Sequence, residues 1–208
     1  AADAVDGRTA PLDTDESFDA VCIAVPIPVA VEAIDTHAEK AEDALVDVTG
    51  VAAEPVAAMR EAAPDRERLS LHPLFAPENE PGNVAAVVDA AGPTTDAIQE
   101  ALLARENTVF ETTAAEHDRA METVQAKTHA AVLAFGLAAD PVPEEFQTPI
   151  SAALFELVEQ VTSGDSRVYA DIQYAFDGAD DVAAAAEEIA AADADGFETL
   201  YSEAGDRR

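Results

Sequence analysis

His72 is the residue whose type and position are best suited to chemistry in this sequence. It lies between Leu71 and Pro73, where an apolar run enters a loop that also contains Pro77. Because the imidazole pKa lies near neutrality, a histidine at a strand end can exchange a proton or a hydrogen bond with a substrate. The chain has four histidines, at positions 37, 72, 117 and 129. Taken alone, the motif is short enough that a packing role for His72 stays open.

The first half of the chain has to provide the element that carries His72. Short, mainly apolar runs cover residues 20–25, 45–48, 69–71, 84–88 and 108–110. Helical stretches follow Pro26, begin at Pro55, and lie between the last two runs, where Thr94 or Thr95 is the expected cap. Continuously apolar strands separated by helices are typical of a mainly parallel sheet covered on both faces. The sequence therefore predicts an α/β fold with His72 at the end of the third strand.

After about Thr112 the pattern becomes helical. Residues 114–139 contain no proline and a single glycine, and their apolar residues recur at helical spacing. They predict one helix of about 25 residues, roughly 38 Å long. Further helices are expected at 148–161, 167–176, 180–192 and from there to about 202. The sequence thus predicts two domains, residues 1–112 and an all-helical domain of residues 113–208. The apolar stripe of the long helix needs a partner, for which we expect a second copy of the chain.

Acidic residues dominate the charge of the chain. There are 43 of them against 11 basic residues, a net charge of −32. Such a surface repels nucleic acid and anionic lipid, so neither is an expected partner. The acidic residues are spread along the chain, and 49% of the residues are hydrophobic, which favours a folded protein over disorder. We expect a protein kept soluble in concentrated salt, from the cytoplasm of a halophile.

Cysteine usage and targeting signals agree with that location. Cys22 is the single cysteine and lies in an apolar run, so it fits a reducing compartment and a place in the core. No apolar stretch approaches the roughly 18 residues of a membrane span, and residues 1–6 lack the features of a signal peptide. We expect a soluble, cytoplasmic protein. Since the chain begins with Ala1 rather than Met, we also expect residues to precede it.

Six short motifs follow one another along nearly the whole chain. They are Val25-Pro26, Asp47-Val48-Thr49 with Val51, Leu71 to Pro77, Glu116-His117-Asp118 with Met121, Gln125 and His129, Thr148-Pro149-Ile150, and Tyr169-Ala170-Asp171-Ile172. In this order and spacing they resemble the prephenate and arogenate dehydrogenases of tyrosine biosynthesis. The resemblance implies a Rossmann-like nucleotide-binding domain, here partial, followed by a helical domain through which the protein forms a homodimer.

The resemblance also implies a reaction. Members of that family oxidatively decarboxylate prephenate to 4-hydroxyphenylpyruvate, or arogenate to tyrosine. Hydride passes from the ring carbon that bears the 4-hydroxyl to NAD or NADP, and the ring carboxylate leaves as carbon dioxide. The role of the family's motif histidine falls on His72, which would hydrogen-bond the substrate hydroxyl and polarise it. No metal is expected, because His117 and Asp118 are adjacent and would point apart on a helix.

The resemblance assigns further residues to the two ligands. Those expected to contact the cofactor are Val25, Pro26 and Thr49. Those expected to contact the substrate are Thr49, His117, Gln125, His129, Gln160 and Arg167. Spacings of eight and four residues put His117, Gln125 and His129 on one face of the predicted long helix. A polar seam between packed helices is the alternative for them.

Three positions depart from the family pattern. Gly50 stands where the family usually has Ser, and Thr49 is the neighbouring hydroxyl that could replace it. Ala52 stands where the family has Lys. Gln160 occupies the position that often carries an Arg for the substrate carboxylate, and a neutral amide cannot form that charged bidentate pair. Arg167 or Arg119 would have to take over, so carboxylate recognition is expected to differ from the family pattern.

One expected motif is not in the sequence. A dinucleotide-binding domain opens with a strand and a G-x-G-x-x-G turn, and none of the nine glycines forms such a cluster. We therefore expect that segment to precede Ala1. Two alternatives stay open. One is a hydroxyacid dehydrogenase that uses a lysine on the long helix, for which Lys127 is the candidate. The other is a truncated, non-enzymatic dimeric remnant with a binding or regulatory role.

Overall fold

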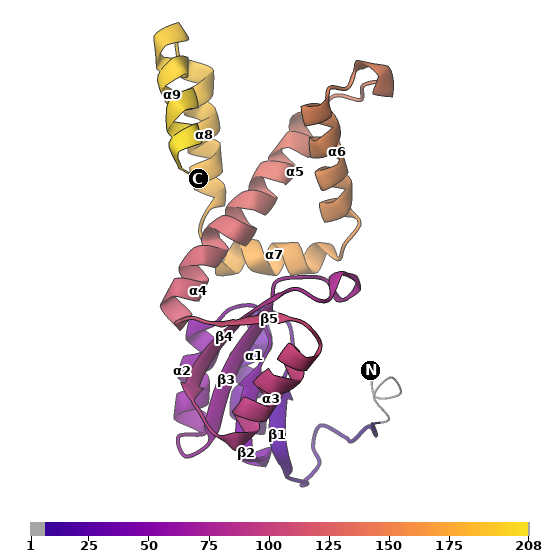
Figure 1. Cartoon of the computed structure of the whole chain (residues 1–208), viewed down its shortest axis with the longest axis vertical. Coiled ribbons are helices and arrows are strands. Elements are labelled where there is room, and N and C mark those ends of the chain that lie inside the picture. Colours follow the sequence, from indigo (N-terminus) through magenta and orange to yellow (C-terminus); the bar gives the residue numbers. More distant parts are fainter. Residues whose placement is uncertain (1–6, 208) are drawn as a thin grey trace. The chain divides into compact units, whose positions relative to one another are not determined.

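The computed structural model describes residues 7–207, which form two compact units (Figure 1). The first unit ends at His117 and the second begins at Asp118, so the division falls a little after the Thr112 expected from the sequence. It lies inside helix α4 (Ala114–Met121), because Ala114 packs on the core of the first unit. Each unit is described by itself below.

The first unit contains a five-stranded sheet in the order β1-β2-β3-β4-β5. Its strands are β1 (Phe18–Ile23), β2 (Ala41–Asp47), β3 (Glu67–Pro73), β4 (Asn83–Ala90) and β5 (Thr108–Glu111). Its longer helices are α1 (Ala30–His37), α2 (Ala53–Ala62) and α3 (Pro93–Ala104). Strands β1, β2 and β3 are parallel, β4 runs antiparallel to β3, and β5 is parallel to β4. The predicted mainly parallel sheet is confirmed, with one antiparallel neighbour.

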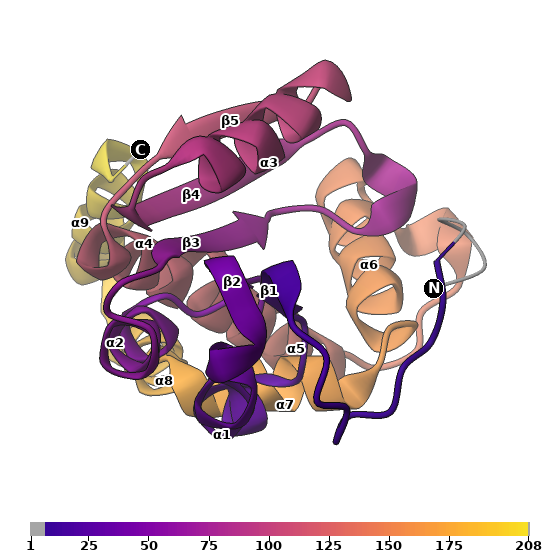
Figure 2. The ribbon, with the colours of Figure 1, turned by 90° about the horizontal axis from the view of Figure 1, so that it is seen from below.

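Helices cover the two faces of this sheet (Figure 2). On one face, residues of α1 and α2 such as Ile34 and Met59 pack against Leu45 of β2. On the other face, Ile98 of α3 packs against the cluster that contains Leu69. Successive side chains of a strand point to opposite faces. Polar residues at the ends of β2 and β3 can therefore share the α1 and α2 face, which is the arrangement that builds the site.

Strand β1 lies at an edge of the sheet, and this explains one wrong prediction. Cys22 was expected in the core, but its side chain is exposed. It points to the face that α3 covers, and α3 contacts β2, β3 and β5 rather than β1. Burial of the thiol group against its immediate neighbours still raises the pKa of Cys22. An edge strand thus leaves one of its faces open even when the strand itself is apolar.

The described part of the second unit, residues 118–207, contains helices and no strand. They are the end of α4, the π-helical turn η5 (Glu122–Lys127), α5 (Thr128–Ala138), the short η6 (Glu144–Phe146), α6 (Pro149–Thr162), α7 (Ser166–Ala175), α8 (Ala179–Ala191) and α9 (Ala194–Asp206). The predicted all-helical half is confirmed. Among residues 7–207, no helix combines the length and apolarity needed to cross a membrane.

The long helix differs from the prediction in one respect, because its middle is π-helical. Gln173 donates its side-chain N–H to the carbonyl oxygen of Ala126 at 2.9 Å, within this turn. Gly178 packs so closely that a Cβ there would lie 2.7 Å from Cγ of Lys127. The hydrogen bond from Gln173 satisfies a backbone carbonyl of the π turn, and the missing side chain of Gly178 leaves room for the turn. The regular spacing assumed for Gln125 and His129 on one α-helical face is therefore interrupted.

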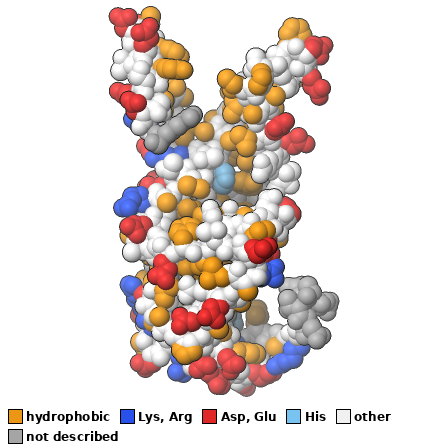
Figure 3. Space-filling view, viewed as in Figure 1, with side chains coloured by type: hydrophobic (Ala, Val, Ile, Leu, Met, Phe, Trp, Pro, Cys, Tyr) orange, Lys and Arg blue, Asp and Glu red, His pale blue; other side chains and the backbone are white. Residues whose placement is uncertain are grey.

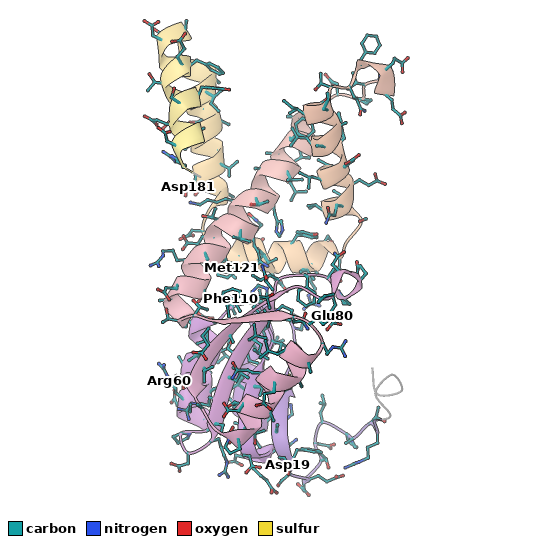
Figure 4. All side chains as sticks on the ribbon, in the orientation of Figure 1. Asp19, Arg60, Glu80, Phe110, Met121 and Asp181 are labelled. Carbon is teal, nitrogen blue, oxygen red and sulfur yellow. The ribbon has the colours of Figure 1, made fainter. Side chains whose placement is uncertain are left out.

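On the face that Figure 3 shows, acidic side chains are scattered over both units rather than gathered in one patch. Several of the few cations are used in local ion pairs. Arg60 and Arg68 both bind the buried carboxylate of Asp89, and Lys127 binds Asp181 at 2.6 Å. Arg60 and Asp181 are labelled in Figure 4. The lysine considered for a hydroxyacid dehydrogenase is thus held by a carboxylate.

Candidate functional site

The candidate site of the first unit is built around a pair of histidines. Nδ1 of His72 and Nε2 of His117 are 2.9 Å apart, and the ring centroids are 5.1 Å apart with the planes at 60°. His72 ends β3 and is half-buried, whereas His117 in α4 is buried. One nitrogen of the pair must donate and the other accept. The sequence named both residues separately, but it did not predict that they touch.

A capping box positions His117. Oγ1 of Thr113 accepts a hydrogen bond from the backbone N–H of Glu116 at 3.2 Å, and a carboxylate oxygen of Glu116 accepts one from Thr113 N–H at 3.3 Å. The backbone N–H of His117 donates to the carbonyl oxygen of Thr113 at 2.9 Å. A Thr-x-x-Glu pattern is the usual signature of such a helix start. The first turn of α4 is therefore fixed where it delivers His117 to His72.

Asp47 is the residue of this site whose chemistry the sequence reasoning missed. It ends β2 with a fully buried side chain. Its Oδ1 accepts hydrogen bonds from Thr49 N–H at 2.9 Å and from Thr49 Oγ1 at 2.5 Å. Its Oδ2 is buried and has no hydrogen-bond partner among residues 7–207. Burial raises the pKa of Asp47, an effect opposed by the hydroxyl groups of Ser70 and Thr49 and by the charge of His117. An acidic residue closing an apolar run was the available signal.

Gly50 lies against the imidazole of His72. A Cβ at Gly50 would lie 3.5 Å from Nε2 of His72, and its φ is +91°, a region that side chains other than glycine rarely adopt. The space beside Nε2 therefore carries no side chain from this position. Thr49 does not supply a hydroxyl there, since its Oγ1 is turned to Asp47.

The two remaining cofactor candidates lie at the end of β1. Val25 is half-buried and packs on the core, and Pro26 is exposed at the start of a short 3-10 turn. Val25 follows β1, Thr49 follows β2 and His72 ends β3. Ligands of open α/β sheets bind at the carboxyl ends of such neighbouring parallel strands.

The candidate substrate-binding residues of the second unit differ in burial. His129 packs its ring on Tyr169 with the centroids 4.8 Å apart, and its buried Nδ1 has no hydrogen-bond partner within residues 7–207. Burial lowers the pKa of His129. Gln125 lies half-buried in the π turn. Gln160 and Arg167, on α6 and α7, are exposed.

A cavity of about 350 Å³ opens beside the ring of Tyr169 in the second unit. Its walls are mostly apolar, with Leu133 and Val161 on opposite helices and Gln173 as a polar group. Across the described residues, no group of three His, Cys, Asp or Glu side chains is placed to hold a metal ion.

Comparison with known proteins identifies the family. Residues 1–91 match the family model described as "Prephenate dehydrogenase, nucleotide-binding domain". The curated 4-amino-4-deoxyprephenate dehydrogenase of Streptomyces pristinaespiralis is 36% identical over 173 residues, which are 77% of this chain. The chain belongs to the prephenate dehydrogenase family. It spans 58% of the length of that curated relative.

Solved structures show that this prephenate dehydrogenase family member has the family's fold. Prephenate dehydrogenase from A. aeolicus, in complex with hydroxyphenyl propionate and NAD+, matches 99% of this chain and 78% of its own, with a TM-score of 0.68 at 14% identity. Arogenate dehydrogenase from Synechocystis matches 90% of this chain and 77% of its own, with a TM-score of 0.54 at 15% identity. The Rossmann-like domain and helical region expected from the sequence are confirmed.

In this prephenate dehydrogenase family member, the nucleotide-binding role falls on the first unit, because the family match covers residues 1–91. Gly50 adds no side chain to the space beside His72, and the carboxyl ends of three parallel strands meet there. The glycine-rich turn that holds phosphates in such domains is not part of the 208 residues. Val25 and the loop at Thr49 follow the first two of these strands.

Proposed function

We propose that this chain carries the hydride-transfer site of an NAD- or NADP-dependent dehydrogenase that oxidatively decarboxylates prephenate or arogenate. The observation that carries the proposal is the position of His72, whose Nδ1 is paired with a buried histidine and whose Nε2 faces Gly50. The family match over residues 1–91 supports a nucleotide-binding role for the same unit. The A. aeolicus relative, solved with NAD+ and hydroxyphenyl propionate, supports the two ligand classes.

His72 supplies the proton chemistry of the proposed reaction. Val25 and the loop at Thr49 would hold a nicotinamide, which supplies the hydride acceptor when it is bound. The imidazole of His72 accepts the proton of the substrate 4-hydroxyl, so that the C4–O bond gains carbonyl character as the C4–H bond breaks. The electrons of the bond to the ring carboxylate then move into the ring, which becomes aromatic as carbon dioxide leaves, and His72 returns the proton to the phenolate oxygen. Backbone at Gly50 can approach this centre closely, since no side chain intervenes.

The proposed carboxylate partner of the substrate is Arg167. Gln160 lacks the charge that the family's Arg supplies at that position. Neither Arg167 nor Arg119 forms an ion pair within residues 7–207, although 43 acidic residues surround the 11 basic ones in this chain. A cation left without a carboxylate in such a protein is available for an anionic substrate. His129 and Gln125 remain proposed substrate contacts from the same unit.

A second candidate substrate carries an amino group in place of the 4-hydroxyl. The relative that is 36% identical is a 4-amino-4-deoxyprephenate dehydrogenase. Gly50 supports this candidate, because it removes the family's serine hydroxyl from the neighbourhood of His72. Parallel assays with prephenate, arogenate and 4-amino-4-deoxyprephenate, each with NAD+ and NADP+, separate the candidates by kcat/KM.

We also propose that the protein forms a homodimer through its helical unit, in a salt-rich cytoplasm. Large apolar side chains of that unit are exposed, among them Tyr174 at 91% and Leu137 at 89%. Helices α8 and α9 bury no residue of their own. Exposed apolar surface of this extent is typical of a protein interface. The single cysteine and the net charge of −32 support the location.

The proposed function is tested by replacing His72 with Asn in the protein as its gene encodes it, assayed in molar potassium chloride. We expect kcat to fall about 10²–10⁴-fold, because the proton acceptor is lost, with KM nearly unchanged. His37→Asn is the matched control, since it removes another histidine of the first unit without touching the pair. A His72→Asn enzyme with wild-type turnover would contradict the proposal, and so would a wild-type protein inactive with all three substrates.

A further inference from the structure

The hydrogen bond between the two histidines restricts where their protons can lie. A neutral imidazole carries one N–H and one lone pair, and the hydrogen bond made by one nitrogen decides the state of the other. Nδ1 of His72 faces Nε2 of His117 at 2.9 Å. The other nitrogen of His72, Nε2, faces the Gly50 loop. The direction of one bond therefore sets the chemistry of the opposite side of the ring.

We propose that His117 is a positioning residue that accepts the Nδ1–H of His72 and thereby holds His72 as the tautomer with its lone pair on Nε2. This inference rests on the proposed function, which requires that lone pair to take the proton of the substrate. In the reverse arrangement, Nε2 of His72 would carry hydrogen and could only donate. His117 would then block the reaction rather than support it.

His117 is held where its Nε2 faces Nδ1 of His72. Only 4% of His117 is exposed, so its ring has little room to turn away. The residue also follows the capping box that fixes the first turn of α4. The acceptor proposed for Nδ1–H of His72 is therefore a buried ring on a fixed helix start.

The two positions also lie on elements that hold them independently. His72 is fixed by ladder pairing, as it lies opposite Ala85 of β4, and His117 by the cap of α4. The geometry of the pair therefore does not depend on a bound ligand. A tautomer fixed in advance avoids reorganisation during the reaction.

The inference is tested by reading the tautomer directly. Long-range proton–nitrogen spectra of ring-labelled histidine distinguish a protonated ring nitrogen from one with a lone pair, and the chain has only four histidines to assign. In the wild-type protein without substrate, we expect Nδ1 of His72 to be protonated and Nε2 to carry the lone pair. A wild-type His72 protonated on Nε2 would overturn the inference, whether or not the protein is a dehydrogenase.

Two variants separate positioning from packing. His117→Gln keeps an oxygen acceptor at a similar reach, so His72 should retain its tautomer and kcat should fall less than about 10-fold. His117→Leu removes the acceptor, so Nε2 of His72 should gain the proton and kcat should fall about 10²–10⁴-fold with little change in KM. An unchanged tautomer in His117→Leu would refute the inference. If that variant does not fold, a wild-type tautomer in His117→Gln supports it and an altered one refutes it.

Discussion

The two units of this chain bury their apolar side chains to very different degrees. In the first unit Ile34, Leu45 and Leu69 are fully buried, and the site at His72 lies on this closed core. In the second unit the large side chains Tyr174 and Leu137 are almost fully exposed. The first unit can therefore hold its chemical groups in place by itself. The helical unit would need a partner surface to be equally well packed, which is why we propose the dimer interface there.

The largest expected effect is on the core of the first unit, and it tests whether the two units really differ in packing. Leu69→Ala should lower the free energy of unfolding by about 2–5 kcal/mol, because the fully buried side chain leaves a cavity in the cluster beneath α3. Leu137→Ala, at an 89% exposed position of the second unit, should change it by less than about 0.5 kcal/mol. Urea unfolding followed by circular dichroism in molar potassium chloride measures both. Equal losses would mean that the two units are packed alike.

The next largest effect is expected in the helical unit, and it tests whether the exposed apolar surface of that unit forms the dimer interface. Tyr174→Glu should raise the dissociation constant of the homodimer at least about tenfold, because exposed tyrosines are common anchors of protein interfaces. Leu103→Glu, at a 52% exposed position of α3 in the first unit, is the matched control and should leave association unchanged. Light scattering over a protein dilution series gives the constants. A dimer that resists Tyr174→Glu but dissociates with Leu103→Glu would move the interface to the first unit.

The sequence predicted local elements much better than contacts between them. All five strands were found, since each contains a short, mainly apolar run. The pairing of His72 with His117 joins residues 45 positions apart, and no periodicity carries that information. The same holds for helix α3, where Thr94 or Thr95 was the expected cap. Its N-cap is Gly92, and the carboxylate of Glu67 on β3 accepts the N–H of Thr95 at 2.7 Å.

The π turn and the burial of Asp47 also depend on contacts between distant residues, which local sequence patterns do not predict. Residues 122–127 have an ordinary helical pattern in the sequence, and their π geometry depends on Gln173 and Gly178, which come more than 40 residues later. Asp47 belongs to one of the sequence motifs, but its full burial could not be predicted, because burial of a polar group at a strand end depends on the helices above it. Candidate residues were therefore predictable one at a time, and their grouping was not.

The smallest expected effect concerns that carboxyl, the polar group that the first unit buries with one oxygen unpartnered. Burial raises the pKa of Asp47 above its ordinary value of 3.8. At a pH between the pKa of Asp47 in the unfolded chain and its raised pKa in the folded protein, only the folded protein holds this proton. The group therefore makes the free energy of unfolding fall as pH rises. Asp47→Asn cannot titrate. The stability of the variant relative to wild type should therefore increase from pH 4 upward, and level off once the folded carboxyl is ionised.

Paired urea titrations at several pH values in constant potassium chloride measure that difference, and the other acidic residues cancel because both proteins carry them. A difference that falls with rising pH would show that the native state stabilises the ionised carboxylate, so that the hydrogen bonds from Thr49 and Ser70 outweigh burial. The pH series on Asp47 thus decides which of the two, burial in the closed core or the hydroxyl groups around it, controls the protonation of this carboxyl.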